Sequence, residues 1–90
     1  MTSTDQYRSY VDESQNSLKC LYMNARSLRH KMQVLFAVVE AIRPDVIGIT
    51  ETWGNDDIPD TEFSIPGFSL FRADRAGNCR GGGVLLLVNQ

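Results

Sequence analysis

The sequence is poor in the residues that anchor several common classes of protein. Only two of its 90 residues are cysteines, Cys20 and Cys79, too few for a disulfide framework and without metal-ligand spacing. No segment approaches the roughly 20 consecutive apolar residues of a membrane helix. The first 17 residues also lack the basic and apolar regions of a secretory signal. We therefore expect an intracellular protein with free thiols and no membrane contact.

An excess of positive charge is missing as well. Nine basic residues face eleven acidic ones, and a formal net charge of -2 excludes a global basic surface for nucleic acid. The charges are nevertheless segregated: residues 45–62 contain six carboxylates and no basic side chain, while residues 19–43 contain five basic residues and one acid. This pattern suits a divalent cation that faces a phosphate, but solvated surface charge is the more ordinary explanation.

The length of 90 residues allows one domain with a thin core. Residues 1–17 are mostly polar and show no apolar periodicity, which predicts a mobile leader. A short linear motif for a partner is the alternative for this segment. We expect the folded domain to cover residues 18–90.

A strand, a helix and a second strand are predicted between residues 18 and 50. Residues 18–23 form a short apolar run that ends at Asn24, as in a buried strand. Ser27 and Pro44 are the expected N-cap and terminator of a helix. Its apolar stripe comprises Leu28, Met32, Leu35, Phe36, Val39 and Ile42. Residues 45–50 lack polar alternation, which predicts a strand covered on both faces and hence a βαβ unit.

The rest of the chain predicts a long loop and a β-hairpin. Residues 51–67 are polar and broken by glycine and proline, and long loops in compact domains are often functional. Residues 68–72 and 83–88 read as two strands joined by the polar segment 73–82. No helix follows Gly81–Gly83, so we interpret these glycines as a bulge or a close backbone approach rather than a phosphate cradle.

Two chemically informative residues stand at the ends of the predicted parallel strands. Asn24 ends the first strand and Glu51 follows the second. Ligands of open α/β sheets collect at the carboxyl ends of the strands, where these two residues are expected to approach each other. A carboxylate suits Mg²⁺, and an amide both donates and accepts hydrogen bonds. Turn formation and capping remain the alternative explanation for both residues.

Three motifs in this order carry a family resemblance. They are C-L-Y-M-N-A-R-S-L at residues 20–28, R-P-D-V-I-G-I-T-E-T-W at 43–53 and R-G-G-G-V-L-L-L-V at 80–88. The chain resembles the endonuclease/exonuclease/phosphatase superfamily, and more narrowly the apurinic-type endonuclease domain of non-LTR (LINE-type) retrotransposon polyproteins. The resemblance implies the N-terminal portion of a four-layer α/β sandwich with a mixed sheet, here a βαβ unit and a hairpin.

The resemblance also implies a chemistry. Asn24 matches the family's active-site asparagine, and Glu51 matches the glutamate that binds Mg²⁺ or Mn²⁺. Many repair-type members have an acidic residue two positions after the asparagine, where this chain has Arg26, as is usual in the retroelement branch. Arg26, Arg72, Arg75 and Arg80 are candidate contacts to the DNA backbone, although a solvated hairpin is the favoured explanation for the last three.

The expected function is the N-terminal part of a Mg²⁺-dependent DNA endonuclease that nicks target DNA for retrotransposition and acts in the nucleus. The family's other catalytic residues lie downstream, so we expect these 90 residues to be inactive alone. The alternatives are a non-catalytic interaction or structural fragment, a decayed retroelement remnant, and a phosphatase of the same superfamily. His30 is expected on the helix surface, and Trp53 as a packing anchor rather than a DNA-stacking residue.

Overall fold

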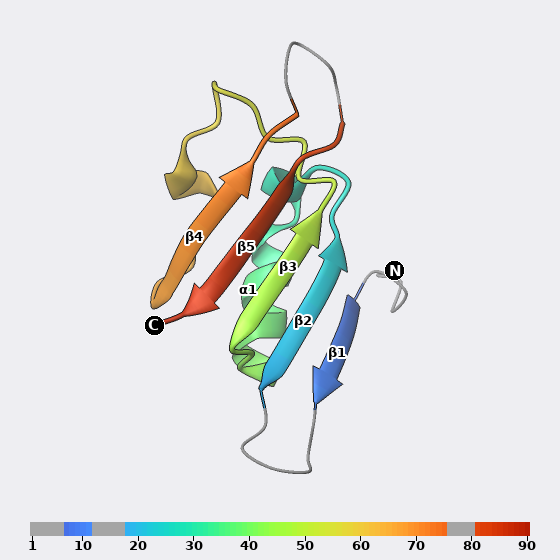
Figure 1. Cartoon of the computed structure of the whole chain (residues 1–90), viewed down its shortest axis with the longest axis vertical. Helices are drawn as coiled ribbons and strands as arrows, with labels where there is room; N and C mark the ends of the chain where they lie inside the picture. Colours follow the sequence, from blue (N-terminus) through green and yellow to red (C-terminus); the bar gives the residue numbers. More distant parts are fainter. Residues whose placement is uncertain (1–6, 12–17, 76–80) are drawn as a thin grey trace.

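The computed structural model describes residues 7–11, 18–75 and 81–90. These residues contain one five-stranded sheet in the order β1-β2-β3-β5-β4 (Figure 1). Strands β2 (Lys19–Asn24) and β3 (Val46–Thr50) are parallel, whereas the other neighbouring pairs are antiparallel. The predicted α/β fold with a mixed sheet is therefore confirmed.

The connection between β2 and β3 contains the helix of the βαβ unit. Helix α1 (Met32–Ile42) is preceded by a separate 3₁₀ turn, η2 (Leu28–His30). The predicted continuous helix from residue 28 is thus wrong at its start. Ser27 has a left-handed conformation (φ 80°) and makes no side-chain capping bond. The predicted end is confirmed, because Arg43 leaves the helical region (φ 54°) directly before Pro44.

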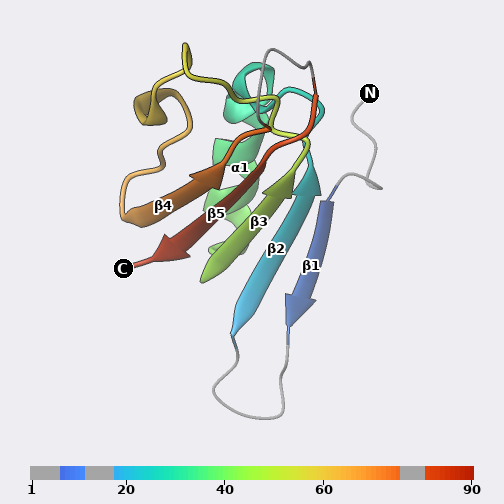
Figure 2. The same cartoon turned by 45° about the horizontal axis from the view of Figure 1, so that its top comes forward.

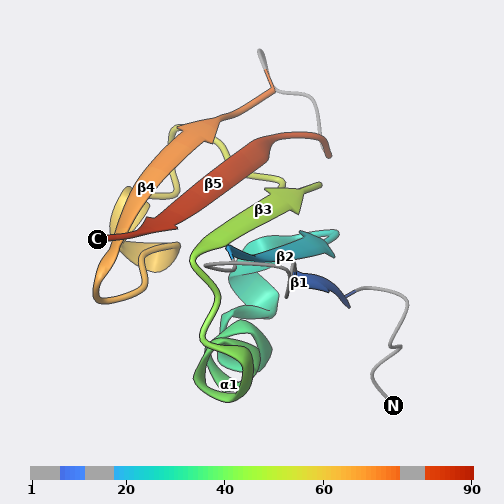
Figure 3. The same ribbon diagram turned by 60° about the horizontal axis from the view of Figure 1, so that its bottom comes forward.

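Helix α1 covers one face of the sheet, and the core lies between them (Figures 2 and 3). Leu28 and Leu35 of the predicted stripe are buried, and Met32, Val39 and Ile42 pack against the core. Phe36 of the predicted stripe is 40% exposed, whereas Val38, which the stripe did not include, packs against the core. The sheet contributes apolar residues from alternate positions: Leu21, Met23, Ile47, Ile49, Leu85 and Leu87.

The opposite face of the sheet is open in the described part of the chain (Figure 3). In β3, Ile47 and Ile49 are buried, while Gly48 and Thr50 are half-buried on the open face. The prediction that this strand is covered on both faces is therefore wrong for the described residues. The open face carries large exposed apolar side chains: Tyr22, Phe71, Val84 and Leu86. The structure thus contains one sheet and one helical layer of the predicted sandwich.

The C-terminal half of the chain forms the predicted loop and hairpin. Strands β4 (Phe68–Ala73) and β5 (Val84–Asn89) pair antiparallel, from Phe68 opposite Asn89 to Ala73 opposite Val84. The long loop between β3 and β4 contains one 3₁₀ turn, η3 (Asp60–Glu62). Strand β5 lies between β3 and β4, so the hairpin extends the parallel pair (Figure 1).

A further strand lies within the segment predicted as a mobile leader. Strand β1 (Tyr7–Val11) pairs antiparallel with β2, with Tyr7 opposite Met23 and Val11 opposite Lys19. The expectation of no regular structure is wrong for these five residues, because backbone pairing to an edge strand needs no apolar periodicity. Residues 1–6, 12–17 and 76–80, with Cys79 and Arg80, lie outside the described residues. None of the described helices has the length and apolarity needed to span a membrane.

Candidate functional site

The carboxyl ends of β2 and β3 lie side by side at one edge of the sheet (Figure 1). Asn24 and Thr50 are register partners, and the amide of Ala25 donates to the Thr50 carbonyl oxygen at 2.8 Å. The pairing continues beyond the strands, since the amide of Ser27 donates to the Glu51 carbonyl oxygen at 3.0 Å. The backbones that carry Asn24 and Glu51 are therefore bonded neighbours, as the βαβ topology predicts.

Asn24 carries a buried polar atom that the surrounding protein does not satisfy. Its side-chain Oδ1 is buried and accepts no hydrogen bond from the described residues. Buried polar atoms in proteins are nearly always paired, and an unpaired one commonly marks the place of a water, an ion or a ligand. This oxygen is thus available to an external donor or cation at the edge where the two strands end.

The segment Glu51–Trp53 has an unusual backbone that neighbouring loops hold in place. Glu51 and Trp53 both adopt positive φ (56° each), a conformation that costs non-glycine residues roughly 1–2 kcal/mol. The amides of Thr52 and Trp53 donate to the carbonyl oxygens of Gly83 and Gly82, at 3.3 and 2.9 Å. Strain of this kind persists where the surrounding structure over-determines it, often at functional sites.

The side chains of this segment are fixed as firmly as its backbone. The indole Nε1 of Trp53 donates to Glu51 Oε2 at 3.1 Å, and both residues are half-buried. The hydroxyl of Thr52, which is 2% exposed, accepts from the amide of Gly54 at 3.3 Å. A Cβ atom at Gly83 would overlap the Thr52 hydroxyl. The predicted close backbone approach in the glycine run is therefore confirmed at Gly83.

The other carboxylates of the acidic segment do not gather around Glu51. Asp45 lies at the opposite end of β3, where its Oδ2 accepts from the amide of Lys19 at 2.8 Å. Asp56 and Asp57 are exposed in the loop. Across residues 18–75 and 81–90, no group of three or more His, Cys, Asp or Glu side chains could hold a metal. The charge segregation in the sequence therefore reflects mostly separate local roles.

Asp60 and Asp74 serve one such role by binding Arg72, which anchors the loop to β4. The Arg72 side chain is only 14% exposed, and its guanidinium stands 5.0 Å from the centre of the Phe63 ring. Hydrogen bonding to Asp74 raises the pKa of Arg72, and Asp60 adds to that effect. Its hydrogen-bond acceptors are the carboxylates of Asp74 and Asp60 and the carbonyl oxygens of Ile58 and Asn55. Arg72 is therefore neither solvated nor presented to DNA, and both expectations for it are wrong. The sequence gives no local signal of the network, because its members are scattered between residues 55 and 74.

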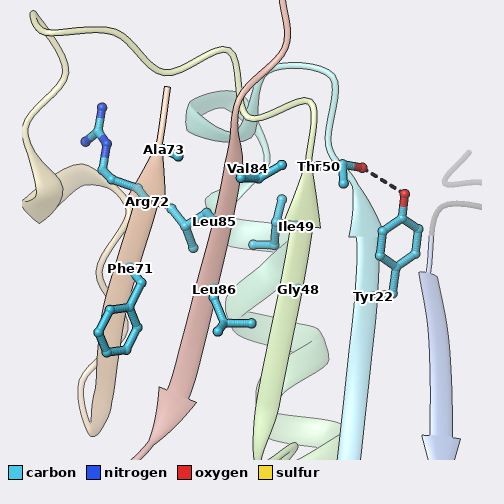
Figure 4. A pocket seen from close by; sticks show the side chains of 10 residues that line it. All are labelled: Tyr22, Gly48, Ile49, Thr50, Phe71, Arg72, Ala73, Val84, Leu85 and Leu86. Atoms are coloured by element: carbon cyan, nitrogen blue, oxygen red, sulfur yellow. Dashed lines mark hydrogen bonds between the residues drawn. The ribbon is translucent and has the colours of Figure 1, made fainter. Parts of the chain in front are cut away.

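A groove on the open face ends beside this edge of the sheet. It has a volume of about 420 Å³, and its lining is almost entirely apolar, with Gly48 at its floor (Figure 4). The hydroxyl of Tyr22 lies 2.8 Å from the hydroxyl of Thr50, the register partner of Asn24. The groove therefore adjoins the strand ends but brings no charged carboxylate of its own.

The model of the endonuclease/exonuclease/phosphatase family matches residues 14–90. The chain belongs to this family. No curated protein matches the chain.

Members of the endonuclease/exonuclease/phosphatase family generally use divalent metal ions. The residues at the edge fit such an ion in kind. Asn24 offers a buried oxygen without a protein partner, and Glu51 offers a carboxylate of which one oxygen is bonded to Trp53. Oxygen ligands of this type are those that Mg²⁺ prefers, with several waters retained. Asn24 and Glu51 therefore offer oxygen atoms of the kind that such an ion takes.

The predicted DNA-contacting arginines stand in different positions around this edge. Arg26 is exposed two residues beyond Asn24 and has positive φ (46°). Arg75 is exposed after β4, and its aliphatic part lies against Gly82. Arg80 lies outside the described residues. The predicted surface position of His30 is confirmed, since His30 is exposed at the end of η2.

Proposed function

We propose that this chain supplies the asparagine–glutamate side of a Mg²⁺- or Mn²⁺-dependent DNA endonuclease of the non-LTR retrotransposon type. The observation that carries the proposal is the unpaired, buried Oδ1 of Asn24 on the backbone segment bonded to that of Glu51. The N-A-R-S-L and E-T-W motifs, with Arg26 in place of an acid, support the retroelement branch. The substrate is then nuclear DNA in an intracellular setting.

The two residues have distinct tasks in this proposal. Glu51 holds the cation through a carboxylate oxygen. The side-chain NH2 of Asn24 donates to the scissile phosphate and orients it, while the unpaired Oδ1 of Asn24 faces the cation or its water. A bound divalent ion supplies Lewis-acid stabilisation of charge on the phosphate and on the leaving oxygen. Hydrolysis also needs a group that activates water. We therefore propose that the 90 residues do not cleave DNA alone.

Isothermal titration with Mg²⁺ and Mn²⁺ tests the metal role directly. The wild-type chain is expected to bind, and Glu51→Gln is expected to lose the binding. Glu40→Gln is the matched control, because Glu40 is exposed on α1, away from the strand ends. Equal heats for all three proteins would contradict the proposal and favour a non-catalytic interaction fragment.

DNA binding is tested by fluorescence anisotropy with a labelled duplex at several salt concentrations. Arg26→Ala and Arg75→Ala are each expected to lower the salt slope by about 1, as the loss of one phosphate contact predicts. Arg29→Ala is the control, because Arg29 lies on η2 and pairs with Glu62 at 3.6 Å. Slopes that do not change would remove both arginines from the proposed DNA surface.

A nicking assay with supercoiled plasmid in Mg²⁺ tests the proposal that the 90 residues do not cleave DNA alone. No nicking by the 90-residue chain is expected. Nicking that disappears in Glu51→Gln would refute the proposed inactivity while supporting the endonuclease chemistry.

A further inference from the structure

Glu51 is oriented by a side chain that reaches it from two residues along the chain. The indole Nε1 of Trp53 lies 3.1 Å from Glu51 Oε2 and donates its hydrogen to it. A carboxylate has two oxygens, so this bond engages Oε2 and leaves Oε1 for another partner. The contact occupies one acceptor site of Oε2 and thus favours Oε1 as the oxygen that faces an incoming cation.

The indole itself cannot move freely, because the backbone around it is fixed on two sides. The loop after β2 binds the carbonyl oxygens of Glu51 and Thr52 through the amides of Ser27 and Leu28, each at 3.0 Å. The entry to β5 holds the other side, since the amide of Trp53 donates to the Gly82 carbonyl oxygen at 2.9 Å.

Gly81 packs closely against the indole of Trp53. A Cβ atom built on Gly81 would lie 3.6 Å from Trp53 Nε1, so this glycine backbone stands against the ring. Gly81 has a φ of 89°, a backbone conformation that residues other than glycine rarely adopt. The indole N–H is therefore directed at Glu51 by the surrounding backbone.

We propose that Trp53 is a positioning residue that presents Glu51 to the cation through one oxygen and thereby favours Mg²⁺ over Ca²⁺. Mg²⁺ requires near-ideal octahedral geometry and keeps several waters, which one carboxylate oxygen accommodates. Ca²⁺ accepts more ligands and often takes both oxygens of a carboxylate, which the Trp53 bond opposes. This inference rests on the proposed metal-binding role of Glu51.

The chain contains a single tryptophan, so the donor can be deleted without a change of shape. Growth in a tryptophan-auxotrophic host with β-(3-benzothienyl)alanine replaces the indole N–H by sulfur at position 53 alone. Titration calorimetry with Mg²⁺ and Ca²⁺ then compares this protein with the wild type. We expect Mg²⁺ affinity to fall about 10-fold, the usual effect of losing a hydrogen bond to a ligand, and Ca²⁺ affinity to change less.

The outcomes separate the inference from the function on which it rests. Absence of Mg²⁺ binding by the wild type, or binding that survives in Glu51→Gln, would overturn both. Binding that depends on Glu51 but has the same Mg²⁺/Ca²⁺ ratio in the sulfur analogue would overturn only the role of Trp53. A lower Mg²⁺/Ca²⁺ affinity ratio in the sulfur analogue supports the role of Trp53 when the thermal midpoint of the apo protein is unchanged. If the Mg²⁺/Ca²⁺ affinity ratio and the thermal midpoint both fall in the sulfur analogue, Trp53→Gln distinguishes positioning from damage to the fold. Its side-chain amide is expected to restore part of the Mg²⁺ preference, and no restoration would overturn the role of Trp53.

Discussion

The anchoring of the long loop by Arg72 gives a prediction whose size can be worked out from the structure. Replacing Arg72 by methionine keeps much of the side-chain volume and removes the guanidinium. Five hydrogen bonds are lost, three to carboxylates and two to backbone carbonyl oxygens. The contact with the Phe63 ring, at 5.0 Å, loses its cationic partner as well.

The bonds of Arg72 do not contribute equally. The pair with Asp74 is well shielded, with side chains 14% and 20% exposed and 2.7 Å between Nη2 and Oδ2. Breaking a fully buried pair costs about 3–5 kcal/mol, so this partly exposed one is worth about 2 kcal/mol. Asp60 is 69% exposed, and its pair adds at most about 0.5 kcal/mol. The two bonds to carbonyl oxygens are partly or fully exposed to solvent and add about 0.5 kcal/mol each, which brings the loss for Arg72→Met to about 3 kcal/mol.

Urea unfolding followed by the emission of Trp53 measures this loss. A domain of 90 residues has a total stability of about 5–13 kcal/mol, so 3 kcal/mol is a large part of it. Arg72→Lys is expected to lose about 2 kcal/mol, because lysine keeps the charge but not the forked geometry. The control is Arg29→Met, whose partner Glu62 is 3.6 Å away and whose side chain is 51% exposed. That variant is expected to lose less than about 0.5 kcal/mol.

The role of Arg72 also predicts a pH profile. The pKa of Arg72 is raised in the folded state, so its contribution to the free energy of unfolding is fully present at any pH below the ordinary pKa of arginine. The contribution disappears only as the pH rises through the raised value, in strong alkali. The Arg72→Met difference should therefore be the same at pH 7 and pH 9. A loss for Arg72→Met that equals that of the Arg29→Met control would refute the anchoring role.

Two further predictions concern the segment that carries Glu51. Gly83→Ala is expected to lose about 3 kcal/mol in urea unfolding, because its positive φ (88°) costs roughly 1–2 kcal/mol and its Cβ overlaps the Thr52 hydroxyl. Gly67→Ala is the control, because Gly67 has a similar φ (87°) and a Cβ atom there would meet no atom within 4 Å, so its loss measures the backbone cost alone. Equal losses for the two variants would show that the overlap with Thr52 costs nothing. Mg²⁺ is expected to change the fluorescence of Trp53 through its bond to Glu51, and the change should vanish in Glu51→Gln. An unchanged response in that variant would place the ion elsewhere.

The βαβ unit and the hairpin could be predicted because their signals are local and periodic. Apolar spacing marks α1, and short apolar runs mark β2, β3 and β5. The meeting of Asn24 and Glu51 at one edge followed from the parallel pairing alone. Topology alone therefore predicted that the backbones of Asn24 and Glu51 lie at the same edge of the sheet.

What could not be predicted depends on contacts between distant segments or on rare backbone conformations. Strand β1 is recruited by backbone pairing with the edge of β2, which leaves no periodic signal. The positive φ of Glu51 and Trp53 has no sequence signature in residues of these types. The bond between Trp53 and Glu51 follows from that backbone, and only the glycine run 81–83 pointed to a close approach.

The backbone bonds from Thr52 and Trp53 to Gly83 and Gly82 make the entry of β5 a wall of the Glu51 site. Gly82 and Gly83 are therefore coupled through backbone hydrogen bonds to the segment of a carboxylate much earlier in the chain. Deuterium exchange at the amides of Thr52 and Trp53 would accordingly slow when a cation occupies the edge, because opening of the hairpin entry and release of the ion become a single event.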